Sequence, residues 1–154
     1  MVSRPSERLG ELGLQLPPPS KPAGSYSPVV VEGKLAWVSG QIVTRDGAAV
    51  NPGVVDRDVD ASTAGGLARL ATLQALAALV HSLGSLDRIR RPLRVGVYVA
   101  SSTGFFRQHE VGNGATDLLL DLFGENGRPA RVSMGVEALP LNAPVEVELL
   151  VAIG

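Results

Sequence analysis

The residues best suited to chemistry lie in the last part of the chain, between positions 129 and 148. Arg131 begins an alternating segment, and the two-residue period of a strand sets its side chain on the face opposite Val132 and Met134. Its planar guanidinium presents parallel N–H donors, which suits bidentate binding of a carboxylate. A surface arginine paired with a neighbouring acid fits the same periodicity, so both interpretations stay open.

Glu146 is the second candidate, because a carboxylate on the corresponding face of the last predicted strand can orient or deprotonate a water molecule. If a turn between Ala138 and Pro144 joins the two strands as a hairpin, Glu146 pairs near Val136, roughly 16 Å from Arg131. One chain cannot then unite the two side chains. A shared pocket needs Arg131 from one copy and Glu146 from another, which predicts that function depends on oligomerisation.

Several other chemistries are excluded by residue type or spacing. The chain has no cysteine, so a thiol nucleophile and a thiolate metal site are ruled out. His81 and His109 have no second ligand three or four positions away, and we expect no metal site. The sequence has no Gly-x-Ser-x-Gly motif and no Walker A motif, and Gly112-Asn113-Gly114 is too short for a dinucleotide fingerprint.

Composition describes one soluble globular domain of 154 residues, 45% hydrophobic, with a net charge of -1. A charge so close to zero offers no field to attract a phosphate backbone, which disfavours nucleic-acid binding as its role. Arg88, Arg90, Arg91 and Arg94 form a basic cluster that is simplest to explain as a solvated link between elements. Residues 1–19 lack the apolar run of a signal peptide, so we expect a cytoplasmic protein.

The elements that must position these residues begin after an N-terminal extension. Residues 1–22 are expected to hold a short helix over 5–15 and a proline-rich linker, and residues 23–154 the main domain. Two strands should flank the turn Glu32-Gly33-Lys34, and a third short strand over 41–44 should precede an Asp46-Gly47 turn. Trp37, in the second of these strands, is expected in the core.

The longest helix is predicted from Asp60 to Leu83, with Asp60 or Ser62 as its N-cap and Gly84 as its stop. Its apolar stretch is interrupted by polar residues, which favours a buried helix over a membrane span; they are Arg69, Thr72, Gln74, His81 and Ser82. Apolar residues still cover most of its circumference. One stripe should meet the sheet and the rest another surface, which suggests oligomerisation. The pair Gly65-Gly66 should permit close backbone packing.

Alternating residues over 93–100, 131–137 and 145–152 predict three further strands, and a helix that ends at Gly124 lies between the first two. The resulting order, βββαβαββ, predicts an α+β fold in which two helices cover one face of a mixed sheet. We place Arg131, Ser133 and Glu146 on the uncovered face, as the wall of a cavity between subunits.

Three separated motifs carry a resemblance to a known family. They are Gly24-Ser25-Tyr26-Ser27-Pro28, then Val38-Ser39-Gly40-Gln41, and Pro129-Ala130-Arg131 running to Leu139-Pro140 with Glu146 and Glu148 beyond. In this order and spacing the chain resembles the Rid family over residues 22–153. These are the YjgF-type imine deaminases, which are also labelled L-PSP endoribonucleases.

The resemblance implies a chorismate-mutase-like fold and a homotrimer with three clefts between subunits. It implies that Arg131 binds the carboxylate of a 2-imino or 2-enamino acid and that Glu146 positions the hydrolytic water. The products would be a 2-keto acid and ammonia, and no cofactor would be needed.

The same resemblance implies four substrate-binding residues. Tyr26 matches the family's pocket tyrosine, the backbone at Gly40 and Ser133 completes the cradle, and Asn113 matches a pocket asparagine. Ser133 stands where the better-known members have cysteine.

Two other functions remain alternatives to the imine deaminase. One is a non-catalytic trimer that binds a small carboxylate or a partner protein. The other is an endoribonuclease or translation inhibitor, which the presence of only two lysines, Lys21 and Lys34, and six aromatic residues disfavours.

Overall fold

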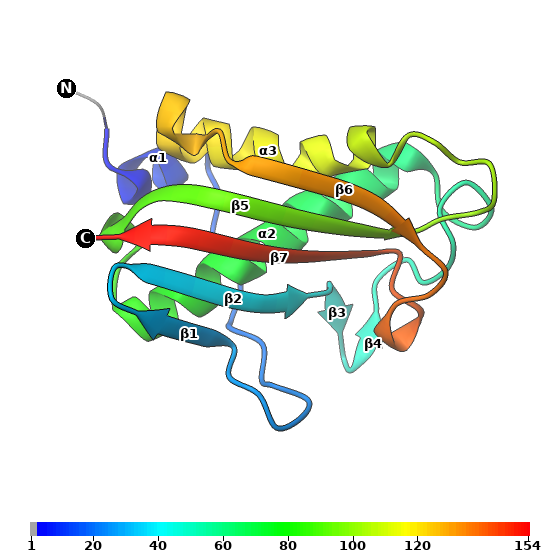
Figure 1. Cartoon of the computed structure of the whole chain (residues 1–154), viewed down its shortest axis with the longest axis horizontal. Helices are drawn as coiled ribbons and strands as arrows, with labels where there is room; N and C mark the ends of the chain where they lie inside the picture. The colour runs from blue at the N-terminus through cyan, green and yellow to red at the C-terminus, as the bar shows by residue number, and fades with distance from the viewer. Residues whose placement is uncertain (1–2) are drawn as a thin grey trace.

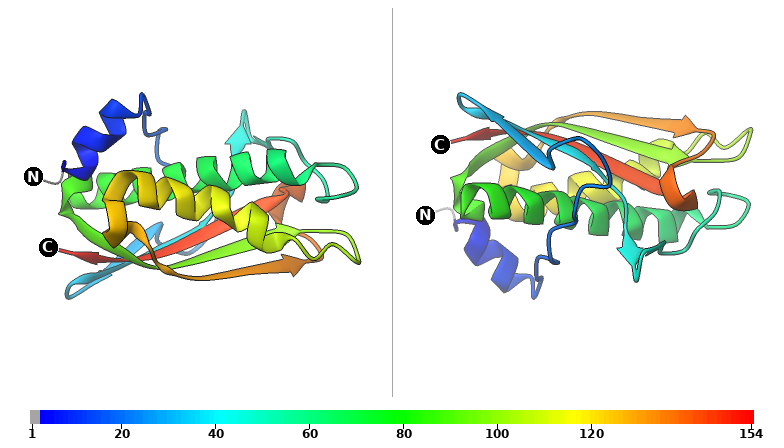
Figure 2. Two further views of the ribbon diagram at one scale, coloured as in Figure 1. Left: turned by 90° about the horizontal axis from the view of Figure 1, so that it is seen from above. Right: turned by 90° about the horizontal axis from the view of Figure 1, so that it is seen from below.

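The computed structural model describes residues 3–154 as a five-stranded sheet with two long helices on one face (Figures 1 and 2). In chain order the elements are α1 (Pro5–Glu11), β1 (Val29–Glu32), β2 (Leu35–Gln41), β3 (Thr44–Arg45), β4 (Ala48–Ala49), α2 (Ala61–Leu83), β5 (Ile89–Ala100), α3 (Gln108–Phe123), β6 (Ala130–Val136) and β7 (Val145–Ile153). Three short 3-10 turns are η1 (Leu86–Arg88), η2 (Gly124–Gly127) and η3 (Pro140–Asn142). The predicted α+β fold, with a mixed sheet covered on one face, is confirmed.

The strand order is β1-β2-β7-β5-β6, and it overturns the predicted hairpin between the last two strands. β6 pairs with β5 in parallel, and β7 lies on the other side of β5, antiparallel to it. Glu146 therefore lies opposite Tyr98 and not near Val136. Alternation assigns the side chains of a strand to its two faces, but it does not specify the neighbouring strand. Here α3 supplies the crossover connection that parallel pairing of β5 and β6 requires.

The predicted third strand is replaced by a small separate hairpin. β2 continues to Gln41, while β3 and β4 pair only with each other around the predicted Asp46-Gly47 turn. Both turn residues have positive φ, 52° and 79°, as a two-residue hairpin loop requires. The main sheet therefore receives two strands, not three, from the region before α2.

Helix α2 has the predicted ends. The Asp60 side chain accepts a hydrogen bond from the Thr63 N–H at 2.7 Å, and Gly84 ends the helix with φ 87°. α2 is long and apolar enough to span a membrane, but 67% of its apolar window is buried inside this fold, as in a core helix.

Part of the second apolar surface of α2 is covered by the chain itself. After α1 the N-terminal segment crosses α2 (Figure 2), and Leu12, Leu14 and Leu16 pack against the core. Gln74 of α2 donates to the Ser20 hydroxyl at 3.4 Å. Leu70 of the same helix remains 46% exposed, and the oligomerisation inferred from this surface stays a prediction.

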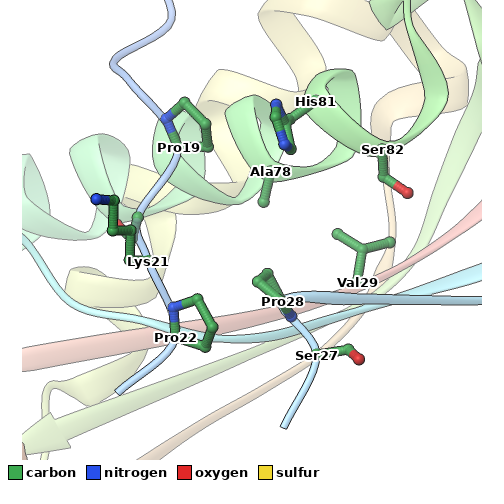
Figure 3. Close-up of a pocket in the computed structure, with 10 residues that line it drawn as sticks. Pro19, Lys21, Pro22, Ser27, Pro28, Val29, Ala78, His81 and Ser82 are labelled. Carbon is green, nitrogen blue, oxygen red and sulfur yellow. The ribbon is translucent and has the colours of Figure 1, made fainter. Parts of the chain in front are cut away.

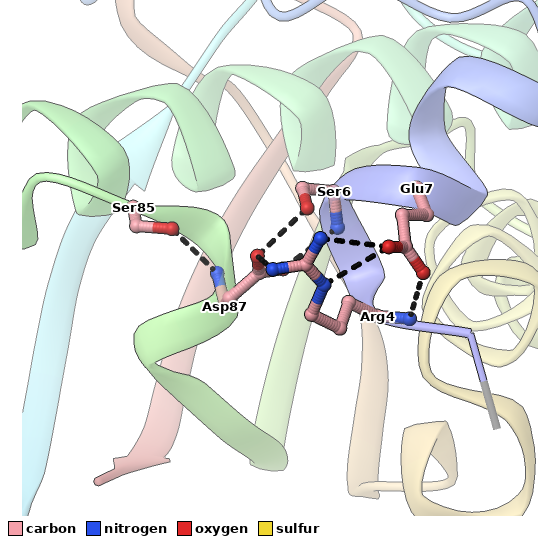
Figure 4. A network of polar contacts seen from close by, with 5 residues as sticks. All are labelled: Arg4, Ser6, Glu7, Ser85 and Asp87. Carbon is pink, nitrogen blue, oxygen red and sulfur yellow. Dashed lines mark hydrogen bonds and ion pairs between the residues drawn. The ribbon is translucent and has the colours of Figure 1, made fainter. Parts of the chain in front are cut away.

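Helix α1 is tied to the turn η1 through Asp87 (Figure 4). The Ser6 N–H and hydroxyl donate to the two Asp87 oxygens at 2.9 and 2.7 Å. Arg4 pairs with Glu7 at 2.7 Å within the same helix. α1 ends at Glu11, four residues earlier than predicted, and the division of the chain at residue 22 stays a prediction.

The two long helices approach closely where Gly114 of α3 lies against the Gly65 carbonyl of α2. A Cβ on Gly114 would overlap that carbonyl oxygen and lie 2.7 Å from the carbonyl carbon. A Cβ on Gly65 would make only an ordinary contact at 3.9 Å, and one on Gly66 would meet nothing within 4 Å. The predicted close packing exists at Gly65, but the glycine that permits it is Gly114.

Candidate functional site

The first group of candidate residues lies in the seam between β6 and α3. Arg131, Ser133 and Gly135 are register partners of Val95, Val97 and Val99, which are fully buried beneath the helices. These three β6 residues therefore face α3. The expectation that Arg131 and Ser133 lie on the uncovered face is wrong, because the apolar set of this edge strand faces away from the helices.

Helix α3 turns a row of residues four positions apart toward this seam, namely Gln108, Gly112 and Thr116. Arg131 Nη1 donates to Asn113 Oδ1 at 2.7 Å and to Thr116 Oγ1 at 3.2 Å. A Cβ on Gly112 would overlap the Ser133 hydroxyl, so this glycine lets β6 and α3 approach. α3 thus fixes the direction of the Arg131 guanidinium.

Arg131 forms no ion pair within residues 3–154, so it is not an arginine paired with a neighbouring acid. All of its hydrogen bonds to this part of the chain leave from Nη1, and the side chain is exposed. Nε and Nη2 remain as a pair of parallel donors. That arrangement is suited to one carboxylate.

Ser133 adds an unsatisfied hydroxyl to the same seam. Its Oγ is buried and has no hydrogen-bond partner among the residues that the structure describes. Leaving such a group unpaired costs about 1–3 kcal/mol, a cost that a polar ligand or water would relieve. Beyond it, Gln108 Nε2 donates to Ser101 Oγ at 3.2 Å and to the Phe105 carbonyl at 2.7 Å.

The second group lies on the opposite face of the sheet and contains Glu146. A Cβ on Gly40 would overlap the Glu146 carboxylate, so the β2 backbone lies directly against it. The register shift between Val38 and Gln41 places Gly40 there. Burial raises the pKa of the Glu146 carboxyl, and the nearby Glu148 carboxylate raises it further.

Glu148 stands beside it in an ordered ion pair. Its Oε1 accepts from Arg94 Nη1 and from the Tyr98 hydroxyl, both at 2.8 Å. Burial acts to raise the pKa of Glu148, but the hydrogen bonds from Tyr98 and Arg94 outweigh it and hold this pKa below its usual value. The pKa of Tyr98 is raised, because its hydroxyl donates to a carboxylate and is partly buried.

This second face carries no helix (Figure 2). It exposes large apolar side chains. Val30, Trp37 and Met134 are 53%, 43% and 43% exposed. The expectation that Trp37 lies in the core is therefore wrong: it is paired with Leu150 on the open face, opposite in direction to the buried Ala36.

Tyr26 belongs to neither group. It lies in the segment before β1, is 51% exposed, and its hydroxyl accepts a hydrogen bond from the Ala23 N–H at 3.2 Å. One chain thus brings Arg131, Ser133 and Asn113 together, and separately Gly40 and Glu146. The sheet lies between the two groups.

Some residues of both groups escaped the sequence analysis. Thr116 and Gln108 share the four-residue spacing that aligns them with Gly112, a stripe that could have been found. Arg94 and Tyr98 could not be assigned to Glu148 without the strand order.

A cavity of about 570 Å³ lies elsewhere, between the proline-rich segment, the start of β1 and the end of α2 (Figure 3). Pro22, Val29 and Ala78 give it apolar walls, and none of the candidate site residues lines it. Within residues 3–154 no cluster of three or more His, Asp or Glu side chains could hold a metal ion.

Comparisons with known proteins agree with the fold. Protein TCP17 of Trypanosoma cruzi is 38% identical over 149 residues, 96% of this chain and 93% of that protein. A crystal structure described as a putative endoribonuclease from Shewanella oneidensis has a TM-score of 0.92 at 32% identity, covering 98% of this chain and all of that one. A protein of unknown function from Agrobacterium tumefaciens has a TM-score of 0.86 at 39% identity, with 97% and 91% covered.

The family model of YjgF/chorismate mutase-like putative endoribonucleases matches residues 6–153, so the match includes α1 from its second residue as well as the sheet and both long helices. It confirms the resemblance drawn from the three motifs. The chain belongs to the YjgF/chorismate mutase-like family of putative endoribonucleases.

Proposed function

We propose that this chain is an imine and enamine deaminase, which hydrolyses reactive 2-imino or 2-enamino acids to 2-keto acids and ammonia. The observation that carries the proposal is Arg131. Its guanidinium is exposed, is oriented by Asn113 and Thr116, and pairs with no carboxylate of residues 3–154.

In this proposal Nε and Nη2 of Arg131 bind the substrate carboxylate, and the Ser133 hydroxyl gains the partner that it lacks within the described chain. Asn113 holds the guanidinium through Nη1 and so acts on its orientation. The carboxylate fixes one end of a small substrate, which leaves the C=N bond to be presented to water.

Glu146 supplies the base. Water adds to the carbon of the protonated imine as one of its protons passes to Glu146 and the C=N electron pair moves to nitrogen. Glu146 then returns that proton to the nitrogen. The C–N bond breaks and ammonia leaves, while the hydroxyl proton passes to Glu146 as the carbonyl forms. A protonated imine is electrophilic enough without a metal or cofactor, so the protein mainly orients the reactants.

Because Arg131 and Glu146 lie on opposite faces of one sheet, we propose that the working site forms between copies of the chain in a homotrimer. The open face with Val30, Trp37 and Met134 is the surface that adjacent copies would cover. Gly40 and Glu146 of one copy would then meet Arg131 of the next, and the exposed Tyr26 would close the cleft. We place this trimer in the cytoplasm.

The test is ammonia release from an imine that an amino-acid oxidase makes in situ. Arg131→Ala should lower kcat/KM about 10- to 100-fold, the value of hydrogen bonds to a charged group. Arg45→Ala, which removes an exposed arginine of the β3–β4 hairpin, is the matched control and should keep full activity. Equal rates for wild type and Arg131→Ala across several imines would refute the proposal.

Glu146→Gln separates the deaminase from a non-catalytic carboxylate binder. Binding of a small keto acid, measured by calorimetry, should persist in this variant while turnover falls. Turnover that is unchanged in Glu146→Gln would remove Glu146 from the reaction.

RNA cleavage is a second candidate, favoured by the description of the Shewanella oneidensis relative. A net charge of -1 argues against strong binding of a phosphate backbone. Cleavage of RNA at physiological salt that is equal in wild type and Arg131→Ala, together with no ammonia release, would favour this second function.

A further inference from the structure

Three polar side chains on the open face have no part in the reaction described above. Arg94 and Tyr98 of β5 both hold Oε1 of Glu148 on β7, each at 2.8 Å. Glu148 lies two positions from Glu146 on the same strand, so both carboxylates point to the same face. The cluster therefore adjoins the base of the proposed reaction.

The register explains why Tyr98 reaches Glu148. Tyr98 lies directly opposite Glu146, while Gly96 lies opposite Glu148. A Cβ on Gly96 would lie 2.8 Å from Glu148 Cγ and 3.1 Å from the Tyr98 hydroxyl. The missing side chain leaves the space in which Tyr98 crosses diagonally to Glu148, a reach that the spacing of sheet neighbours allows.

Groups from β5, β7 and β2 surround the Glu146 carboxylate. Tyr98 faces it from β5, Glu148 from its own strand, and Gly40 contributes only backbone from β2. Arg94 lies beyond Glu148, bound to it. Within residues 3–154 no donor reaches the Glu146 carboxylate, because the nearby hydroxyl and guanidinium both serve Glu148.

One carboxylate is thus fixed in its charged form while its neighbour is left unpaired and half-buried. Two carboxylates in different surroundings divide their roles, since the charged one makes ionisation of the other less favourable. The pKa of Glu146 is raised by burial and by Glu148, in agreement with this arrangement. A carboxylate with a raised pKa holds a proton more readily than an ordinary glutamate, as a group that takes and returns a proton requires.

We propose that Glu148, fixed by Arg94 and Tyr98, is a positioning residue that governs when Glu146 carries a proton, an inference that rests on the proposed deaminase function. In this inference Glu148 binds neither the substrate nor the attacking water. It acts through its charge on Glu146, and Arg94 moderates that charge.

The experiment follows the Glu146 carboxyl carbon by NMR during a pH titration of the full chain, labelled at glutamate Cδ and assigned with Glu146→Gln. Glu148→Gln removes the negative neighbour and should shift the Glu146 midpoint to lower pH. Arg94→Gln removes the positive charge that moderates Glu148 and should shift it to higher pH. Glu32→Gln, at the far end of β1, is the matched control and should leave the midpoint unchanged.

Opposite shifts in the two variants support the inference, whereas a purely structural ion pair gives no shift or shifts of one sign and overturns it. The pH profile of ammonia release then distinguishes the two proposals. Its acidic limb should follow the NMR midpoint in each variant. If the NMR midpoints of Glu146 move while the pH profile of ammonia release stays fixed, Glu146 is not the catalytic base. That result would count against the proposed mechanism and not against the effect of Glu148 on Glu146.

Discussion

The crossing of α2 and α3 can be tested by adding one methyl group at two different glycines. In Gly114→Ala the new Cβ would overlap the Gly65 carbonyl oxygen and lie 2.7 Å from its carbon. Neither atom can rotate away, because both belong to the backbone of a helix. In Gly66→Ala the new Cβ meets nothing within 4 Å.

The two substitutions should change stability in opposite directions. Ordinary carbon contacts lie near 3.5–4.0 Å, so Gly114→Ala must push the helices apart by roughly 1 Å. Overpacking of this kind costs about 3 kcal/mol, and the helix preference of alanine returns about 1 kcal/mol. The net loss of about 2 kcal/mol corresponds to a Tm lower by about 4–8 °C. Gly66→Ala gains helix preference alone and should raise Tm by about 2 °C.

The assay is thermal and urea unfolding of both variants beside wild type, with ammonia release measured on the same samples. Gly114→Ala should also lower turnover, because Asn113 and Thr116 move with α3 and orient Arg131. Equal stability of Gly114→Ala and wild type, or a similar loss in Gly66→Ala, would refute the close approach at Gly65.

Three further predictions concern separate side chains. Asp87→Ala removes both acceptors of Ser6, so α1 should detach more often, and trypsin should cut faster after Arg8 than in the control Asp117→Ala. Ser133→Ala deletes a buried unpaired hydroxyl, so unfolding free energy should stay equal or rise by up to about 1 kcal/mol while KM for an imine rises; a clear loss of stability would show that the hydroxyl is hydrogen-bonded. The folded chain binds the Glu146 proton more tightly than the unfolded chain, because the folded pKa lies above the usual 4.5. The stability that this proton contributes is fully present below the usual pKa and is lost as pH rises through the higher pKa of the folded chain. Glu146→Gln does not titrate, so it should be more stable than wild type near neutral pH. This difference in unfolding free energy should vanish below the usual pKa. A difference that is the same at both pH values in urea unfolding would contradict the raised pKa.

Local patterns in the sequence predicted most elements, because caps and alternation are local properties. Asp60 and Gly84 bound α2 as predicted, and the strand period separates Arg131 from Val132 correctly. The Asp46-Gly47 turn was also predicted in place. These features depend on neighbours within a few positions along the chain.

What the sequence could not predict is which elements lie side by side. The alternation of β6 is equally compatible with a hairpin to β7 and with parallel pairing to β5. Arg131 was assigned to the wrong face because the apolar residues of β6 were expected to face the helices. Trp37 was misplaced for the same reason, since an apolar side chain can serve a core or an uncovered sheet face equally well. Both errors concern which face of the sheet the helices cover.

Arg131 and Glu146 of one chain lie on opposite faces of the sheet, and we propose that they act together only between copies. The most direct test exchanges subunits of Arg131→Ala and Glu146→Gln in equal amounts. In random trimers, half of the sites receive an intact Arg131 and half of those an intact Glu146, so about one quarter of wild-type activity should appear.

A second mixture combines wild type with the Arg131→Ala, Glu146→Gln double variant in equal amounts. It should show about one quarter of wild-type activity if each site is shared between copies, and about one half if one chain supplies both residues of a site. Ammonia release near one quarter in both mixtures is the predicted result. Activity that stays at the level of the single variants in the first mixture, with one half in the second, would contradict the account.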